Sequence, residues 1–223
     1  MSHTLFEGSD HYVATADLMM AVNAAITLQR PLLVKGEPGT GKTMLAEEIA
    51  RALGRELIVW PIKSTTKAQQ GLYEYDAVSR LRDAQLGEAR SQEVGHYIIK
   101  GKLWEAFDAE QAPVLLIDEL DRTDEAFEAF LLEILSDFQM TIPELGTIKA
   151  EHPPIVIITS NRTREIHDAL KRRCLYHWVD YPSAERELAI VKSRVPNIGA
   201  KLSQQVVGFV QALREQAQMP LTI

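Results

Sequence analysis

The chain has 223 residues, of which 46% are hydrophobic and 25% charged, enough apolar material for the core of one large or two small domains. Its formal net charge of −7 argues against broad electrostatic attachment to nucleic acid, and its single cysteine excludes an internal disulfide. Because we find neither a signal-peptide pattern nor an apolar run of the roughly 18–20 residues that span a membrane, we expect a soluble, cytoplasmic protein.

Apolar segments that predict buried strands alternate along the chain with helical patterns. Strands that are apolar throughout and alternate with helices indicate a parallel sheet covered on both faces, so we predict an α/β fold. A polar segment at 67–90 is expected to form helices and loops on the surface. The predicted elements are, in order, helix 14–28, strand 32–34, helix 42–53, strand 57–60, helix 101–109, strand 114–117, helix 127–138, hairpin 140–148, strand 155–159 and a possible fifth strand at 178–179.

Pro182 and Ser183 mark a predicted boundary between an α/β domain at 1–182 and a helical subdomain at 183–223. One or two helices do not form an independent core, so we expect this subdomain to pack on the first domain or to be truncated. A later helix of the subdomain is predicted to carry one apolar stripe, formed by Leu202, Val206, Val210, Leu213 and Ala217.

Residues 36–43 read GEPGTGKT and match the phosphate-binding pattern G-x-x-x-x-G-K-[ST]. Glycines let the backbone approach phosphate oxygens, and the N–H groups of the loop and of the following helix then face the anion. The alternative is a chance glycine-rich turn, but the match lies between an apolar strand and a helix, which is the required context. We expect Lys42 to reach the β- and γ-phosphates and Thr43 to bind Mg²⁺, within a loop formed by Gly36, Glu37, Pro38, Gly39, Thr40, Gly41, Lys42 and Thr43.

The strand at 114–117 ends on Asp118 and Glu119, two carboxylates that could also be merely solvated. The carboxyl ends of parallel strands face one crevice, so we expect both residues near the phosphate loop. Asp118 is then predicted to hold Mg²⁺, and Glu119 to orient and deprotonate the water that attacks the γ-phosphate. No N-K-x-D motif is found, which argues against a GTPase.

A polar segment follows the strand at 155–159. Asn161 could contact the γ-phosphate, or it could be an ordinary turn residue. Five basic residues then lie within fourteen positions, and Arg172 and Arg173 among them could be solvated or paired with Glu165 and Asp168. The five are Arg162, Arg164, Lys171, Arg172 and Arg173.

The combination of GEPGTGKT, LLIDELD, TSN and AL-x-RRC resembles an AAA+ ATPase. The finer pattern is similar to the MoxR branch and, within it, to CoxD-type members. It comprises YVATADLMMAVNAAITLQRPLLVKGEPGTGKT near the start, a polar insert around GLYEYD, and a hairpin before the strand that leads to Asn161. The similarity covers nearly the whole chain.

The resemblance implies that ATP and Mg²⁺ are the cofactors and that residues 183–223 are part of a helical lid. It implies that Asn161 is the first sensor residue, and that Arg173, or else Arg172, enters the ATP site of a neighbouring subunit in a hexameric ring. It also suggests Tyr12 and Val13 as adenine contacts, although an ordinary strand or turn contact is equally compatible. A second sensing residue is expected beyond residue 223.

The resemblance further implies that ATP hydrolysis remodels or matures a protein client. It suggests a metalloenzyme such as molybdenum–copper carbon monoxide dehydrogenase, with a von Willebrand factor A-type partner. Two alternatives remain: a nucleic-acid-stimulated ATPase, supported only by the basic cluster, and an ATP-gated scaffold with little turnover. Cys174 is most simply a packed hydrophobe, and the spacing of Cys and His shows no zinc site.

Overall fold

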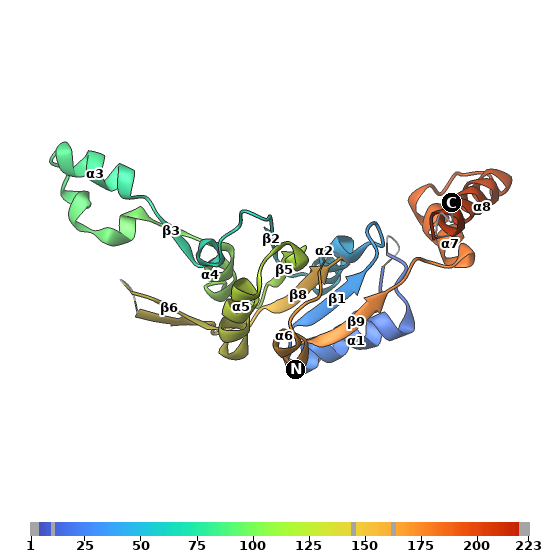
Figure 1. Ribbon diagram of the computed structural model, residues 1–223, viewed down its shortest axis with the longest axis horizontal. Coiled ribbons are helices and arrows are strands. Elements are labelled where there is room, and N and C mark those ends of the chain that lie inside the picture. The colour runs from blue at the N-terminus through green and yellow to red at the C-terminus, as the bar shows by residue number, and fades with distance from the viewer. Residues whose placement is uncertain (1–4, 10–11, 144–145, 162–163, 219–223) are drawn as a thin grey trace, which may run out of the picture.

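The computed structural model describes residues 5–9, 12–143, 146–161 and 164–218. Its centre is a five-stranded sheet in which every neighbouring pair of strands is parallel (Figure 1). The order across the sheet is β2-β5-β8-β1-β9, which confirms the predicted parallel α/β fold. The strands are β1 (Leu32–Gly36), β2 (Leu57–Pro61), β5 (Val114–Asp118), β8 (Ile155–Ser160) and β9 (Leu175–Val179).

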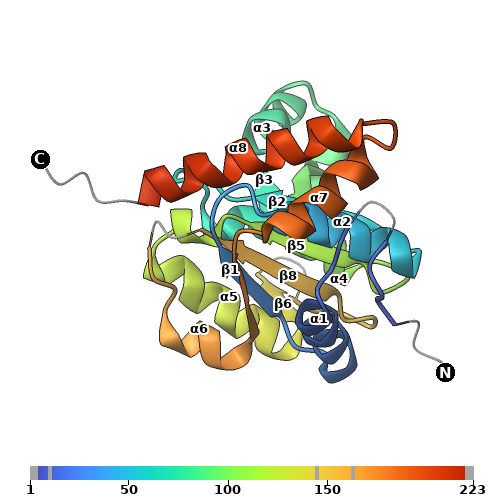
Figure 2. The same cartoon turned by 90° about the vertical axis from the view of Figure 1, so that its right-hand side faces the viewer.

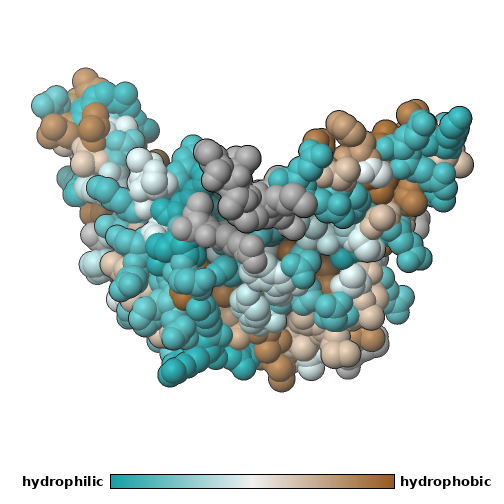
Figure 3. Space-filling model, turned by 45° about the vertical axis from the view of Figure 1, so that its right-hand side comes forward, coloured by the Kyte–Doolittle hydropathy of each residue, from teal (hydrophilic) through white to brown (hydrophobic). Residues whose placement is uncertain are grey.

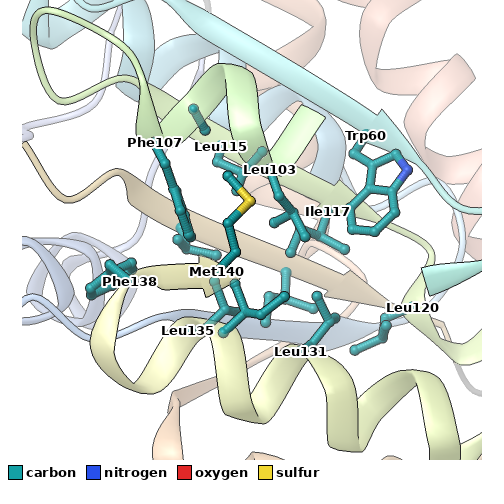
Figure 4. Close-up of a cluster of buried hydrophobic side chains, with 14 of the residues drawn as sticks. Trp60, Leu103, Phe107, Leu115, Ile117, Leu120, Leu131, Leu135, Phe138 and Met140 are labelled. Atoms are coloured by element: carbon teal, nitrogen blue, oxygen red, sulfur yellow. The ribbon is translucent and has the colours of Figure 1, made fainter. Parts of the chain in front are cut away.

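Helices cover both faces of the sheet, and each face has its own apolar core. One core contains side chains of α1 (Ala16–Leu28) and α2 (Lys42–Leu53). The other contains side chains of α4 (Lys102–Phe107), α5 (Glu125–Asp137) and α6 (Asp168–Arg173). Between them β1 is buried along its whole length, as its apolar sequence predicts. Figure 4 shows the second core, which includes Trp60, Leu103, Phe107, Leu115, Ile117, Leu131 and Leu135.

The ends of the helices follow capping side chains and glycine. Thr15 accepts a hydrogen bond from the Leu18 N–H, and α1 therefore begins at Ala16, two residues later than predicted. Gly54 ends α2 in the left-handed conformation, at the predicted stop. The predicted helix 101–109 is shorter in the structure, where α4 covers Lys102–Phe107. No helix among the described residues is both long and apolar enough to cross a membrane.

A long arm leaves the sheet after β2 and projects from the body (Figure 1). Tyr97 and Arg90 both bind the buried carboxylate of Asp83, with Oη–Oδ2 and Nε–Oδ2 distances of 2.9 and 3.0 Å. The predicted surface character holds for most of the arm, but Leu72 joins the core. The arm comprises η1 (Ala68–Gly71), β3 (Tyr73–Tyr75), α3 (Ala77–Gln85), η2 (Ala89–Gln92), η3 (Val94–Tyr97) and β4 (Ile98–Lys100).

The predicted hairpin is present as β6 (Gln139–Ile142) and β7 (Gly146–Lys149), which pair in antiparallel fashion. The final helices, α7 (Ala184–Arg194) and α8 (Ala200–Gln218), lie at the opposite end of the molecule from the arm (Figure 1). Figure 2 shows them above the sheet, with α8 running across α7. The surface is hollowed between the arm and these two helices (Figure 3).

The predicted apolar stripe of α8 is wrong as a packing face. Leu202, Val206 and Leu213 are 55%, 43% and 48% exposed, whereas Ser203 and Val207 are buried. The side chain of Ala217 lies outside the described part of the chain, and Val210 is half-buried. Polar contacts set the rotation of the helix, because Glu187 of α7 binds Gln211 (2.8 Å) and forms an ion pair with Arg214. Apolar periodicity alone does not register such contacts.

Replacing Gly71 by Ala should destabilise the fold, because a Cβ there would lie 2.3 Å from the ring of Trp60 in the core. We expect a loss of about 1–3 kcal/mol in the free energy of unfolding, measured with urea. Gly95→Ala is the control, since a Cβ at Gly95 meets nothing within 4 Å. Equal stability of the two variants would contradict the packing of η1 on β2.

Candidate nucleotide-binding site

The phosphate loop joins the end of β1 to the start of α2. Gly39 and Gly41 have φ angles of 76° and 84°, which favour glycine. A Cβ at Gly36 would lie 2.1 Å from the carbonyl oxygen of Val179, so only glycine fits beside β9. The loop therefore owes its path to its glycines, as the sequence predicts.

Lys42 is 7% exposed, and its ammonium group curls back over the loop. Its Nζ donates hydrogen bonds to the carbonyl oxygens of Gly36 (3.0 Å) and Glu37 (2.6 Å). Burial lowers the pKa of Lys42 from its ordinary value, and the carboxylates of Asp121 and Asp118 oppose this shift. The cation is thus held where anionic phosphates would approach the loop N–H groups.

Thr43 and Asp118, the two predicted Mg²⁺ ligands, lie side by side. The Thr43 hydroxyl donates to both carboxylate oxygens of Asp118, at 3.1 and 3.2 Å. Mg²⁺ prefers oxygen ligands and is usually held by one or two carboxylates together with water and substrate phosphates. A hydroxyl beside one carboxylate fits that requirement. Among the described residues, no cluster of three or more His, Cys, Asp or Glu side chains could hold a metal by itself.

Glu119 follows Asp118 with a φ of 63° and a ψ of 48°, a left-handed conformation that is uncommon for glutamate. This turn is held by Thr159, whose Oγ1 donates to Asp118 Oδ1 (2.5 Å) and accepts from the Glu119 N–H (2.8 Å). The Glu119 carboxylate then faces Arg122 Nε at 3.0 Å and Asn161 Nδ2 at 3.5 Å. Holding glutamate in this conformation costs on the order of 1–3 kcal/mol, which the hydrogen bonds of Thr159 and the Glu119 contacts help to offset.

Asn161 lies directly after β8, the strand next to β5. Its backbone N–H donates to Asp121 Oδ1 at 2.9 Å, and its side-chain amide faces Glu119. The parallel pairing of Ile117 with Ile158 brings both strand ends to the same edge of the sheet. The structure therefore brings together Lys42, Thr43, Asp118, Glu119 and Asn161, all of which the sequence singled out.

Tyr12 and Val13 line a cavity of about 260 Å³ between the phosphate loop and the last two helices. Tyr12 is 7% exposed, and its buried hydroxyl has no hydrogen-bond partner among the described residues. Burial raises the pKa of this hydroxyl to about 12. Arg186 of α7 donates to the Val13 carbonyl oxygen at 2.8 Å, which ties the last helices to this segment. The remaining apolar lining comes from Met44, Ile190, Val191, Val206, Val207 and Val210.

Arg172 and Arg173 lie away from this site. They end α6 just before β9 begins, whereas the phosphate loop follows the end of β1. Because β1 and β9 are parallel and pair from Leu32 with Leu175 to Gly36 with Val179, the two arginines lie at the opposite edge of the sheet. A strand of that length spans roughly 16 Å. Both side chains are exposed, and Arg173 Nη1 donates to Ser136 Oγ at 2.9 Å.

The rest of the basic cluster is largely paired. Lys171 contacts both Glu165 and Asp168 at 3.3 Å, so the acidic partners considered for the arginines bind the lysine instead. Arg164 forms an ion pair with the buried Glu128. Arg162 lies outside the described residues. Cys174 is buried, and burial raises the pKa of its thiol to about 12, which agrees with a packing role.

Sequence reasoning did not single out four residues that complete the site. Thr159 ends the predicted strand 155–159, and a polar residue at the carboxyl end of a buried strand is itself a signal. Asp121 lies two residues beyond Glu119 in LLIDELD and could have been noted there. Arg122 and Arg186 reach the site only through the folds of η4 (Leu120–Arg122) and α7, which no local pattern reveals.

Comparison with solved structures agrees with this architecture. A protein of Cytophaga hutchinsonii assigned as an ATPase superposes with a TM-score of 0.56 at 18% identity, covering 81% of this chain and 49% of that one. A variant of RuvB from Thermotoga maritima gives a TM-score of 0.56 at 19% identity, covering 92% of this chain and 60% of that one. At these identities the likeness concerns the fold alone.

Among curated proteins, the gas vesicle ATPase GvpN of Haloferax mediterranei is 26% identical over 205 residues, which are 84% of this chain and 57% of GvpN. This chain thus spans little more than half of that relative's length. The family described as AAA domain (dynein-related subfamily) matches residues 31–174, from the start of β1 to the end of the α6 region. That match covers more than half of the 223 residues and includes the phosphate loop and both carboxylates, so the chain belongs to the dynein-related subfamily of AAA ATPase domains.

Proposed function

We propose that this protein binds ATP with Mg²⁺ at the carboxyl edge of its sheet and hydrolyses it to remodel a protein client. The observation that carries the proposal is the convergence of Thr43, Asp118, Glu119 and Asn161 at one edge, beside Lys42 and the loop N–H groups. Residues 1–182 supply the phosphate and metal site, and residues 183–223 act as a lid over the adenine base. Family membership supports the use of ATP and Mg²⁺.

Each side chain has a distinct task in the proposed reaction. Lys42 exchanges its carbonyl partners for the β- and γ-phosphates, and Thr43 and Asp118 would hold the metal ion. Bound Mg²⁺ supplies neutralisation of the phosphate charge. Glu119 orients the attacking water and accepts its proton, and the Asn161 amide fixes the same water relative to the γ-phosphate. Arg122 and Asn161 keep the Glu119 carboxylate pointed into the site.

The adenine base is proposed to enter the cavity beside Tyr12 and Val13. The cavity is mostly apolar and bordered by Met44 and Val191, which suits a flat aromatic ring. The buried Tyr12 hydroxyl supplies a hydrogen-bonding group that residues 5–9, 12–143, 146–161 and 164–218 leave unsatisfied. ATP binding thereby connects the phosphate loop to α7 and α8.

Arg173 lies at the edge of the sheet opposite its own phosphate loop. It could therefore act only on ATP that is bound by a second subunit. AAA ATPases commonly assemble as rings, and in a hexamer the α6 edge of one subunit would face the ATP of the next. A planar guanidinium suits the charge that spreads over the transferring phosphoryl group. We propose Arg173 as this residue, with Arg172 in reserve, because both are exposed and lie away from their own phosphate loop.

The client is proposed from the resemblance to MoxR-type proteins, particularly CoxD-type members. It is a metalloenzyme under maturation, such as molybdenum–copper carbon monoxide dehydrogenase, reached through a von Willebrand factor A-type partner. The projecting arm offers exposed apolar side chains for such a contact, namely Val78, Leu81 and Leu86. The nucleic-acid alternative is weakened because Arg164 and Lys171 are committed to carboxylates within the chain.

Mixing two inactive variants tests whether sites are shared between subunits. Glu119→Gln removes the general base, and Arg173→Ala removes the arginine that would enter the neighbouring ATP site. Each variant alone should lose most ATPase activity, by about 10³-fold for the arginine. Their mixture should regain part of the rate, because some interfaces combine an intact Glu119 with an intact Arg173. No recovery in a mixture that assembles would contradict a shared site.

Tyr12→Phe tests the base pocket. The hydroxyl has no hydrogen-bond partner in the described part of the chain, so its removal should leave the free energy of unfolding without nucleotide unchanged or slightly higher. We expect ATP to bind about 3- to 10-fold more weakly, the equivalent of one hydrogen bond, when measured by calorimetry. Tyr75→Phe on the arm is the control. An unchanged affinity in Tyr12→Phe would exclude this hydroxyl as a nucleotide contact.

Thr159→Val tests the link between the two carboxylates. It removes the donor to Asp118 and leaves the Glu119 N–H without its acceptor, so we expect a loss of about 1–3 kcal/mol in unfolding free energy. We also expect a higher Mg²⁺ concentration for half-maximal ATPase rate, with recovery in Thr159→Ser. Thr141→Val, at an exposed hairpin hydrogen bond, should change neither quantity. Unchanged Mg²⁺ dependence in Thr159→Val would contradict the proposed link.

A further inference from the structure

We infer that Arg30 is a positioning residue for the arginines that α6 offers to the neighbouring subunit. Its guanidinium donates from Nε to the Arg173 carbonyl oxygen (3.0 Å) and from Nη2 to the Arg172 carbonyl oxygen (2.6 Å). The backbone of both candidate arginines is therefore held by one side chain. This inference rests on the proposed function, in which one of them acts in trans.

The contact is chemically strong. The last carbonyl groups of a helix have no partner within the helix and carry partial negative charge. Arg30 satisfies two of them with a charged planar fork, which lysine cannot reproduce with the same geometry. Because α6 has only six residues, helix propensity alone cannot hold its last turn in place.

Arg30 is itself fixed on the body of the protein. Gln29 ends α1 in the left-handed conformation, and the Arg30 N–H donates to the Ala25 carbonyl oxygen at 3.1 Å. Pro31 follows, and its carbonyl oxygen accepts from the Leu175 N–H at 2.8 Å, where β9 begins. The backbone at Arg30 is thus anchored by the end of α1 on one side and by the pairing of β1 with β9 on the other.

Arg30 holds the backbone of Arg173 but leaves its side chain able to move. The Arg173 guanidinium contacts only Ser136 Oγ among the described residues, at 2.9 Å. A cavity of about 150 Å³ lies here, lined by Arg30, Ser136, Leu170 and Arg173 among others. The guanidinium can therefore exchange the serine hydroxyl for a phosphate of the next subunit while its backbone stays in place. Preserving that backbone position matters, since small misplacements in a reactive geometry are costly.

Arg30 is remote from the ATP of its own subunit. It precedes β1, whereas the phosphate loop follows that strand, so the two lie at opposite edges of the sheet. A role in the protein's own site and a role in the neighbour's site therefore predict different behaviour in mixed assemblies.

The test begins with Arg30→Ala. Its control is Arg55→Ala, which removes an arginine that donates to the side chain of Gln111. We expect Arg30→Ala to lower kcat for ATP hydrolysis by roughly 10- to 100-fold, with the Kd for ATP unchanged. Arg55→Ala should match the unmodified protein. An unchanged kcat in Arg30→Ala would overturn the inference. If Arg30→Ala does not fold, Arg30→Lys takes its place in every arm of the test.

Mixing then decides where Arg30 acts. Arg30→Ala retains its own Glu119, so activity should recover with Glu119→Gln subunits, which supply an intact α6, and should not recover with Arg173→Ala subunits. The opposite pattern, recovery with Arg173→Ala alone, would place Arg30 in its own site and overturn the inference. Failure of the trans proposal itself is recognised separately. In that case Arg172→Ala and Arg173→Ala would both retain the full rate, and Arg30 would have no trans-acting arginine to position.

Discussion

The hydrogen bonds around Asp118 are the contacts on which the rest of the site depends. Its carboxylate accepts from Thr43, at the start of α2, and from Thr159, at the end of β8. Thr159 in turn accepts from the Glu119 N–H. Three separate segments of the chain thus meet at one carboxylate, and this is possible only because β1, β8 and β5 are parallel neighbours that end at one edge. The backbone strain at Glu119 persists because these bonds hold it.

The same parallel strands divide the chemistry between two edges. The carboxyl edge carries the phosphate loop, both carboxylates and Asn161, while the opposite edge carries α6, held by Arg30. A strand cannot bend back to bring these edges together. If Arg173 acts as we propose, a subunit completes the site only by association with another copy, because its own α6 and phosphate loop lie at opposite edges of the sheet.

Much of this was predictable from local patterns. The three central strands β1, β5 and β8 are largely buried and begin as apolar runs, and the phosphate loop is confined by glycines whose spacing is itself the signal. The position of Asp118 followed from one topological rule about parallel strands, whereas the role of Asn161 was implied by the family resemblance. These features depend on few residues that are close in sequence.

Other features could not be predicted, because they depend on contacts between distant segments. The rotation of α8 is set by polar contacts to Glu187, which override its apolar periodicity and leave Leu202 exposed. The contact of Arg30 with α6 spans more than 140 residues of sequence and follows only from the pairing of β1 with β9.

The central claim is that one ATP site is built from two subunits. The ATPase rate per subunit, measured at saturating ATP and Mg²⁺ over a range of protein concentrations with sedimentation recorded in parallel, tests it most directly. The account predicts a rate per subunit that is low for monomers and rises as assemblies form. A full rate per subunit in monomers, independent of concentration, would contradict it.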